Sequence, residues 1–211
     1  KGAVVINCKK AVIGQQVSPE DSVIVNGKAI TNNYAKKLLI LAFNKPIGII
    51  CTTDTNIKDN IIDYIGYPDR IFPIGRLDKD SQGLIFLTNN GDIVNKILRG
   101  GNNHEKEYLV TVNNPITEKF IYDMAGGVPI LGITTKKCLI KRESKYIFNI
   151  TLVQGTNRQI RRMCEYLDYK VIKLERIRIM NIRLGKLVIG GWRKLIQKEL
   201  LKIKELLKNS N

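Results

Sequence analysis

Metal-binding and membrane-spanning patterns are missing from this 211-residue sequence. There is a single histidine, His104, and the four cysteines form no Cys-x-x-Cys pair. A structural zinc site therefore lacks its usual ligand spacing, and we expect no metal. No apolar run approaches the roughly 20 residues that cross a bilayer, so we expect no membrane partner. Scattered single cysteines are typical of reduced thiols, which predicts a cytoplasmic location.

Acidic side chains are also scarce. The sequence has 35 Lys and Arg against 19 Asp and Glu, a formal net charge of +16. The imbalance lies mainly in the second half, since residues 1–100 hold 13 basic and 9 acidic side chains and residues 101–211 hold 22 and 10. An excess of this size says more about partners than about the fold, and it predicts a polyanion such as RNA.

The stretch from Gly75 to Gly91 joins a charged loop to a buried strand. Residues 76–80 read Arg-Leu-Asp-Lys-Asp, and the apolar run Leu84–Thr88 that follows has the length and composition of a strand. A carboxylate held one loop away from a buried strand is fixed in space, as a catalytic group must be, so Asp78 is a catalytic candidate. The alternative is an ordinary surface ion pair between Asp78 and a basic neighbour in the same loop.

A second candidate lies on a predicted strand over residues 106–112. The alternation of side chains along a strand places Tyr108, Val110 and Val112 on one face. From these residues alone, Tyr108 is interpreted as part of the core.

A helix is predicted after Gly155, with Thr156 or Asn157 as its cap. Its apolar stripe consists of Ile160, Met163, Cys164 and Leu167. Its adjoining face carries Arg158, Arg161 and Arg162. Positive charge is unfavourable at the amino terminus of a helix, so these arginines indicate a nearby anion, either RNA phosphate or the Asp78 carboxylate or both. The alternative is a solvated basic face. A final amphipathic helix is predicted over residues 193–208.

The three motifs resemble those of the pseudouridine synthases, in the branch that modifies ribosomal RNA. They are Gly-Arg-Leu-Asp at 75–78, Lys-x-Tyr at 106–108 and Asn-Arg-Gln-Ile-Arg-Arg-Met at 157–163, in the order found in that family. The resemblance covers residues 38–208 and implies an α+β fold, a mixed and largely antiparallel sheet flanked by helices. Residues 1–33 resemble the second half of an S4-type RNA-binding module, which predicts a partial S4-like appendage.

The resemblance also implies a role for individual residues. Asp78 is expected to be the catalytic carboxylate, Tyr108 to line the uracil pocket, and Arg161 to pair with Asp78. Contacts with RNA are expected from Lys45, Arg76, Arg158, Gln159, Arg162, Lys173 and Arg176. No cofactor is implied, because the isomerisation oxidises nothing and consumes neither water nor a nucleotide.

Finer motifs, at residues 72–83, 104–108 and 174–181, resemble the F-type large-subunit branch, which modifies uridine 2604 of 23S ribosomal RNA. This predicts 23S ribosomal RNA as the partner of a monomeric enzyme, with a uridine of another ribosomal RNA or of transfer RNA as the alternative. Two other classes stay open. The spacing Asp78-x-Asp80 is shared with phosphoryl-transfer enzymes of the haloacid dehalogenase type, which need Mg²⁺, and charge alone also fits a non-catalytic RNA-binding ribosome factor.

Overall fold

The computed structural model describes residues 3–18, 20–30, 38–98 and 103–208. The chain divides into two compact units, residues 1–37 and residues 38–211. The end of the predicted S4-like module, residues 31–33, and the link that follows it lie outside the described residues.

The first unit is a small antiparallel sheet in the order β2-β1-β3-β4. Its strands are β1 (Val4–Ile6), β2 (Lys9–Lys10), β3 (Val23–Val25) and β4 (Lys28–Ile30). Asn26 and Gly27 both have positive φ, 49° and 75°, as a two-residue hairpin turn requires. Ile6 is the buried apolar side chain of this unit among the described residues. The S4-like interpretation of this unit stays a prediction.

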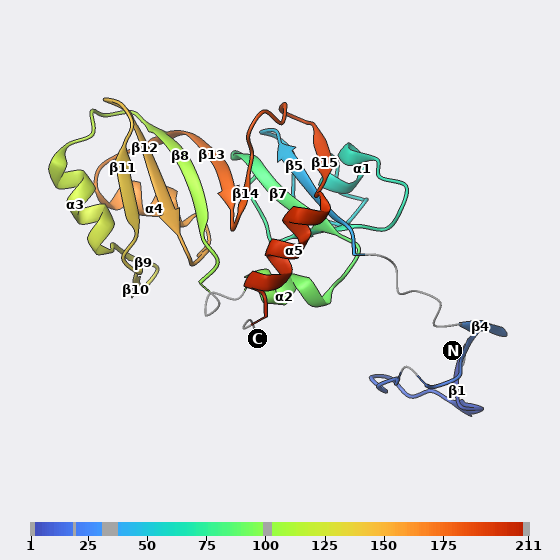
Figure 1. Cartoon of the computed structure of the whole chain (residues 1–211). Helices are drawn as coiled ribbons and strands as arrows, with labels where there is room; N and C mark the ends of the chain where they lie inside the picture. Colours follow the sequence, from blue (N-terminus) through green and yellow to red (C-terminus); the bar gives the residue numbers. More distant parts are fainter. Residues whose placement is uncertain (1–2, 19, 31–37, 99–102, 209–211) are drawn as a thin grey trace. The chain divides into compact units, whose positions relative to one another are not determined.

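The second unit is built on a nine-stranded sheet in which β11-β12-β8-β13-β7-β5-β15 lie side by side, with β14 paired to β13 and β6 paired to β7 (Figure 1). The strands are β5 (Ile40–Lys45), β6 (Phe72–Ile74), β7 (Gln82–Thr88), β8 (Lys106–Val112), β11 (Leu139–Arg142), β12 (Ile147–Leu152), β13 (Val171–Ile179), β14 (Ile182–Arg183) and β15 (Trp192–Lys194). β13 and β7 run parallel, and the other described pairs in this sheet are antiparallel. The predicted mixed, largely antiparallel sheet is therefore confirmed.

Helices cover different parts of this sheet, as Figure 1 shows. They are α1 (Ile61–Ile65), α2 (Asp92–Leu98), α3 (Glu118–Gly126), α4 (Gln159–Tyr166) and α5 (Gln197–Leu206), and the short strands β9 (Pro129–Ile130) and β10 (Ile133–Thr134) form a separate hairpin. The apolar sides of α3 and α4 form one core with β8, β12 and β13. The helices α2 and α5 form a second core with β5 and β7. The sheet is thus packed as two halves that meet where β13 pairs with β7.

Strand β7 is buried on both faces, which explains its unbroken apolar run. Leu84 and Phe86 pack on the side of α2 and α5, whereas Ile85 and Leu87 pack on the side of α1. Leu77, next to Asp78, packs in the same apolar cluster as Ile85 and Leu87. The loop that carries Asp78 is therefore anchored to the most buried strand of the sheet.

The prediction of a helix over residues 193–208 is wrong at its start. Trp192–Lys194 is an edge strand paired with β5, and the helix begins at Gln197. Glu199 explains this boundary, because its carboxylate accepts hydrogen bonds from the guanidinium of Arg193 at 2.8 and 2.7 Å and from the backbone of Ile196 at 3.0 Å. A carboxylate at this position caps the first turn of the helix.

Gly83 permits the close approach of β7 to β13. Its φ is +109°, and a Cβ placed there would lie 2.4 Å from the carbonyl oxygen of Arg176. We expect Gly83→Ala to lower the free energy of unfolding by about 3 kcal/mol, because it adds both overpacking and backbone strain. Urea titration measures this change. Gly91→Ala is the control, since a Cβ at Gly91 meets nothing within 4 Å; equal stabilities of the two variants would contradict the prediction.

Candidate active site

A cleft of about 460 Å³ opens where the two halves of the sheet meet. Its walls come from the Gly75–Asp78 loop, from β8 and β13, and from the amino-terminal end of α4. Its charged lining residues are Arg76, Asp78, Lys106, Arg158 and Arg176. A single carboxylate therefore lies among four basic side chains in this part of the described structure.

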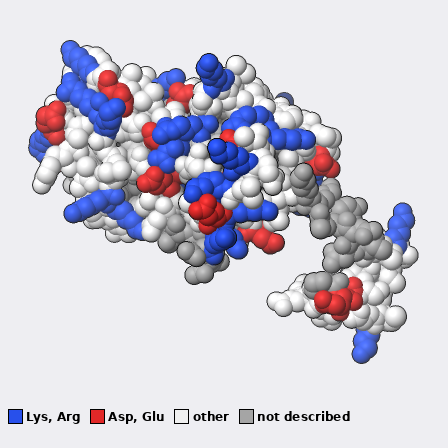
Figure 2. All heavy atoms as spheres, in the orientation of Figure 1, with Lys and Arg blue, Asp and Glu red and all other residues white. Residues whose placement is uncertain are grey.

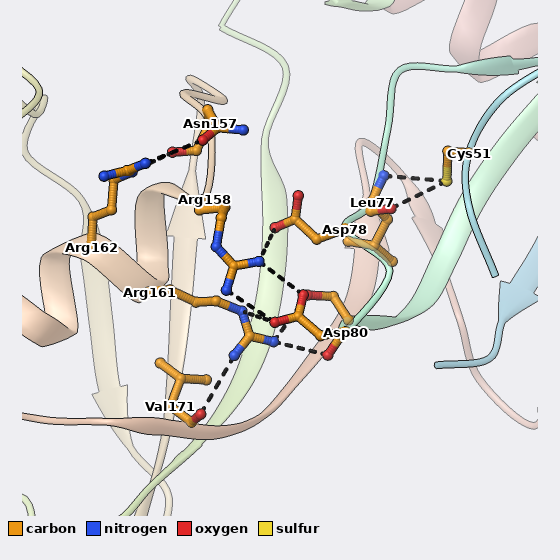
Figure 3. A network of polar contacts seen from close by, with 10 residues as sticks. Cys51, Leu77, Asp78, Asp80, Asn157, Arg158, Arg161, Arg162 and Val171 are labelled. Atoms are coloured by element: carbon orange, nitrogen blue, oxygen red, sulfur yellow. Dashed lines mark hydrogen bonds and ion pairs between the residues drawn. The ribbon is translucent and has the colours of Figure 1, made fainter. Parts of the chain in front are cut away.

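Backbone and thiol contacts hold the loop that carries Asp78 in place. The amide of Gly48 donates to the carbonyl of Lys79 at 2.8 Å. The buried thiol of Cys51 lies 3.3 Å from the carbonyl oxygen and 3.4 Å from the amide nitrogen of Leu77 (Figure 3). Both contacts flank Asp78 in the sequence, so they restrict the backbone on either side of the carboxylate.

The Asp78 carboxylate has a partner outside its own loop. Nη1 of Arg158 lies 3.9 Å from Asp78 Oδ2, and the Asp78 side chain is 34% exposed. Lys79, a partner in the surface-pair alternative, instead lies 3.8 Å from Asp59. A partly exposed carboxylate in a cleft with a cation from a distant helix fits a site better than a local surface pair.

The expected pairing of Arg161 with Asp78 is wrong, because Arg161 contacts the next acidic residue of the loop (Figure 3). Its Nη2 donates to the backbone carbonyl of Asp80 at 2.9 Å and to Ser81 Oγ at 3.2 Å. Its Nε lies 3.3 Å from Asp80 Oδ2 without hydrogen-bond alignment, so that contact is electrostatic. Arg161 is buried, and its contacts with Asp80 and Ser81 hold this part of the loop in place.

The start of α4 explains why Arg158, rather than Arg161, lies beside Asp78. The expected caps, Thr156 and Asn157, do not cap the helix, whose N-cap is Arg158 in the left-handed region at φ 50°. Arg158 therefore projects toward the loop, where it makes a two-pronged contact with Asp80 at 3.1 and 3.0 Å. The Arg158 hydrogen bonds, together with the charge of Arg161, hold the pKa of Asp80 below its usual value. Asp80 is thus the anion that compensates the arginines of the helix.

Burial divides the residues that were expected to bind RNA. Arg76, Arg158 and Lys173 are exposed, and Arg162 is partly exposed. Gln159 and Arg176 are each 4% exposed and line the cleft. A phosphate on the outside of the protein can reach the first group but not the second.

Lys45 is corrected from an RNA contact to a structural residue. It is fully buried, and its ammonium donates to the carbonyls of Pro46 at 2.9 Å and Ile49 at 2.8 Å. Burial lowers its pKa. Because these carbonyls flank Gly48, whose amide donates to the loop that carries Asp78, Lys45 supports this loop from the interior.

Tyr108 and two buried cations form one side of the cleft. The ring of Tyr108 lies 6.0 Å from the guanidinium carbon of Arg176, its partner on the neighbouring strand. Lys106 is buried, and its ammonium donates to the carbonyl of His104 at 3.1 Å. Sequence reasoning missed Lys106, although its spacing of two from Tyr108 places both on the same face of the strand. Tyr108 packs against the core, as expected from the strand pattern, and it also lines the cleft.

The outer face of the second unit carries both signs of charge. Figure 2 shows Lys and Arg side chains across the region where Figure 1 places β13, β14 and α5, with acidic side chains among them. Among the described residues, Arg178 is paired with Glu105 and Glu107. The positive excess of the sequence is therefore partly compensated on this face.

Within the described part of the chain, no three His, Cys, Asp or Glu side chains are grouped so that they could hold a metal ion. Over the same residues, no helix combines the length and the apolar character of a membrane span.

Comparison with known proteins decides the family. The family described as RNA pseudouridylate synthase matches residues 39–166, which include the cleft residues from Ile74 to Ile160. The chain belongs to this RNA pseudouridine synthase family.

Individual relatives agree. The dual-specificity RNA pseudouridine synthase RluF of Escherichia coli is 58% identical over 211 residues, which span 100% of this chain and 73% of the relative. The ribosomal large subunit pseudouridine synthase B of Buchnera aphidicola is 34% identical over 92% of this chain and 83% of its own length. A solved structure described as a pseudouridylate synthase superposes with a TM-score of 0.75 at 30% identity, covering 97% of this chain and 89% of that one.

This membership makes the protein an isomerase that converts uridine to pseudouridine in RNA. It favours the isomerase over the phosphoryl-transfer alternative, which rested on the spacing of Asp78 and Asp80. In the structure Asp80 is occupied with Arg158 and Arg161.

The contact of Cys51 with Leu77 generates one prediction. Cys51→Val removes both hydrogen bonds to the backbone beside Asp78, whereas Cys51→Ser can keep them. Two hydrogen bonds of this kind are worth roughly 1–2 kcal/mol, so we expect Cys51→Val to lower the single-turnover rate about tenfold. RNA affinity should be unchanged, and Cys51→Ser should retain most of the rate. Identical rates for the two variants would show that the thiol does not position the loop.

The buried ammonium of Lys106 generates a prediction about pH. Burial, and secondarily the charge of Arg176, lowers the pKa of Lys106 to about 8 in the folded protein, from 10.5. Between these values the unfolded chain binds more protons, so folding becomes more favourable as pH rises, by up to on the order of 3 kcal/mol. Lys106→Met lacks this dependence. Thermal unfolding should therefore show the parent gaining stability relative to Lys106→Met between pH 8 and 10; parallel profiles would contradict the shift.

Proposed function

We propose that this enzyme isomerises a uridine of 23S ribosomal RNA, at position 2604, with Asp78 as its catalytic residue. The observation that carries the proposal is the composition of the cleft, in which Asp78 is the carboxylate among four basic side chains. Isomerisation of a nucleobase in RNA needs one reactive carboxylate, and basic surroundings attract the polyanionic substrate to it.

The reaction breaks the bond between uracil N1 and ribose C1′ and forms a bond between C5 and C1′. C5 loses a proton and N1 gains one, so the product has the same atoms as the substrate. Ionised Asp78 starts this sequence, either by attack at C1′ or by removing the proton at C2′. Both routes need a carboxylate that faces the ribose while the uracil occupies the cleft.

Neighbouring residues prepare the carboxylate and the base. Tyr108 packs against the uracil from β8, in reach of C5 for the proton transfer. Arg161 is a positioning residue that acts through Asp80 and Ser81. Arg76 is exposed at the mouth of the cleft and fills the space left by the flipped nucleotide. Arg158, Arg162 and Lys173 are the exposed or partly exposed cations that hold phosphates.

The names of two relatives support the proposed substrate. One is named for the ribosomal large subunit, and another is named as a dual-specificity enzyme. We therefore include a second RNA, such as a transfer RNA, among the proposed substrates. The enzyme acts as a monomer in the cytoplasm, where ribosomal RNA is made and assembled in bacteria.

Replacement of the catalytic carboxylate tests the assignment. Asp78→Asn keeps the size of the side chain but removes its charge, so pseudouridine formation should fall by at least about 10³-fold. RNA affinity should be equal or slightly higher, because a negative charge leaves a cleft that binds phosphates. Pseudouridine formation in a 23S ribosomal RNA fragment is measured beside filter binding of the same fragment.

Two further variants make the test specific. Asp123→Asn removes an acid that is paired with Lys119 on α3, and it should leave the rate unchanged. Asp80→Asn should reduce the rate only in part, because it loosens Arg158 and Arg161 without removing the reactive acid. Turnover by Asp78→Asn near the parent rate would refute the assignment.

A further inference from the structure

One side of the cleft contains a buried cation with an unused donor. Arg176 is 4% exposed and lines the cleft. Its Nε donates to the carbonyl of Leu84 at 2.6 Å, whereas its Nη2 is buried and has no hydrogen-bond partner among the described residues. An unpaired buried donor on a charged group costs considerable free energy, so a partner for Nη2 is expected in the functional complex.

The sheet holds Arg176 with little freedom. Its Cα pairs with Tyr108 on one side and with Gly83 on the other. Gly83 brings β7 so close that the backbone of Arg176 cannot move toward it. The bond from Nε to Leu84 then fixes the plane of the guanidinium. This is the preorganisation that a site for charge stabilisation needs.

The position of Arg176 favours a base over a phosphate as its ligand. Exposed arginines, such as Arg158 with 40% of its side chain exposed, can reach the RNA backbone. Arg176 lies deeper, 6.0 Å from the ring of Tyr108, where a flipped base would lie. Asp78 does not balance the charge of Arg176, since among the described residues its carboxylate forms an ion pair with Arg158. Lys106 adds a second buried cation beside it. These two cations make the inner cleft suited to a planar ligand that acquires negative charge.

We propose that Arg176 is a catalytic residue that binds a carbonyl oxygen of the flipped uracil through its guanidinium. When the bond between N1 and C1′ breaks, its electron pair stays with the base and is shared with the oxygens at C2 and C4. The hydrogen bond from Arg176 becomes stronger as this charge develops, so it favours the transition state over the bound substrate. Arg176 gives up no proton, since a guanidinium stays charged. The inference rests on the proposed function, because it takes uridine as the substrate.

Variants of Arg176 test the role through the rate. Arg176→Gln removes the charge and should lower the single-turnover rate by about 10²–10³-fold, as loss of one such donor does elsewhere. The affinity for the 23S ribosomal RNA fragment and its salt dependence should change less than twofold. Arg176→Lys keeps the charge and should recover part of the rate. Arg142→Gln is the matched control, because it removes one exposed arginine on β11, outside the cleft, and should have the parent rate.

Altered substrates test the contact without changing the protein. Sulfur accepts hydrogen bonds poorly, so 2-thiouridine or 4-thiouridine at the target should slow the parent at least tenfold. The same substitution should have no further effect on Arg176→Gln. This arm decides the question even if Arg176→Gln unfolds, because parent rates that are equal for uridine and both thio forms would overturn the proposal.

Other outcomes also count against it. A normal rate with weaker binding, and a salt slope reduced by about 0.7–0.9, would identify Arg176 as a phosphate contact and refute its role with the base. If the parent converts no uridine in the 23S fragment, the substrate assignment fails. The variants are then compared on total cellular RNA, where Arg176→Gln must still be slower than Arg142→Gln for the role of Arg176 to stand.

Discussion

The parallel pairing of β7 with β13 is the contact on which the site depends. It brings Gly83 against the backbone of Arg176 at a distance that excludes any side chain. This pairing joins a half-sheet covered by α3 and α4 to a half-sheet covered by α2 and α5. The loop before β7, the Tyr108 face of β8 and the amino-terminal end of α4 meet at that junction, so the cleft exists because the two halves join there.

Charge is arranged in two layers around Asp78. Inside the cleft, one carboxylate lies among Arg76, Lys106, Arg158 and Arg176. Behind it, Asp80 takes the ion pairs of Arg158 and Arg161. Because Asp80 takes the two-pronged contact of Arg158 and the ion pair of Arg161, Asp78 keeps only a longer contact with Arg158, at 3.9 Å. For the proposed role of Asp78 this matters, because a close two-pronged partner would make the carboxylate a weaker nucleophile or base.

Some of the sequence-based expectations are confirmed and others are wrong. The family, the sheet and the helix after Gly155 were predicted well, because apolar periodicity and short motifs are local properties of a sequence. The partners of Arg161, the burial of Lys45 and the start of α5 were predicted wrongly. The contacts of Arg161 and the start of α5 depend on residues far away in the sequence, namely Asp80 and the β5 edge that pairs with Trp192–Lys194. The Lys45 ammonium is instead bound by carbonyls close in the sequence, those of Pro46 and Ile49, and its burial was missed because no periodic pattern marks it.

The sequence by itself determined the reaction class and the position of the candidate acid, because the Gly-Arg-Leu-Asp, Lys-x-Tyr and Asn-Arg-Gln-Ile-Arg motifs are contiguous in the chain. Only the tertiary structure decided which basic residues are exposed and which are buried. Arg158 and Arg176 look alike in the sequence, yet one is exposed at a helix start and the other is buried between two strands. Burial depends on how distant strands pair, and strand pairing is set by packing across the whole sheet rather than by neighbouring residues.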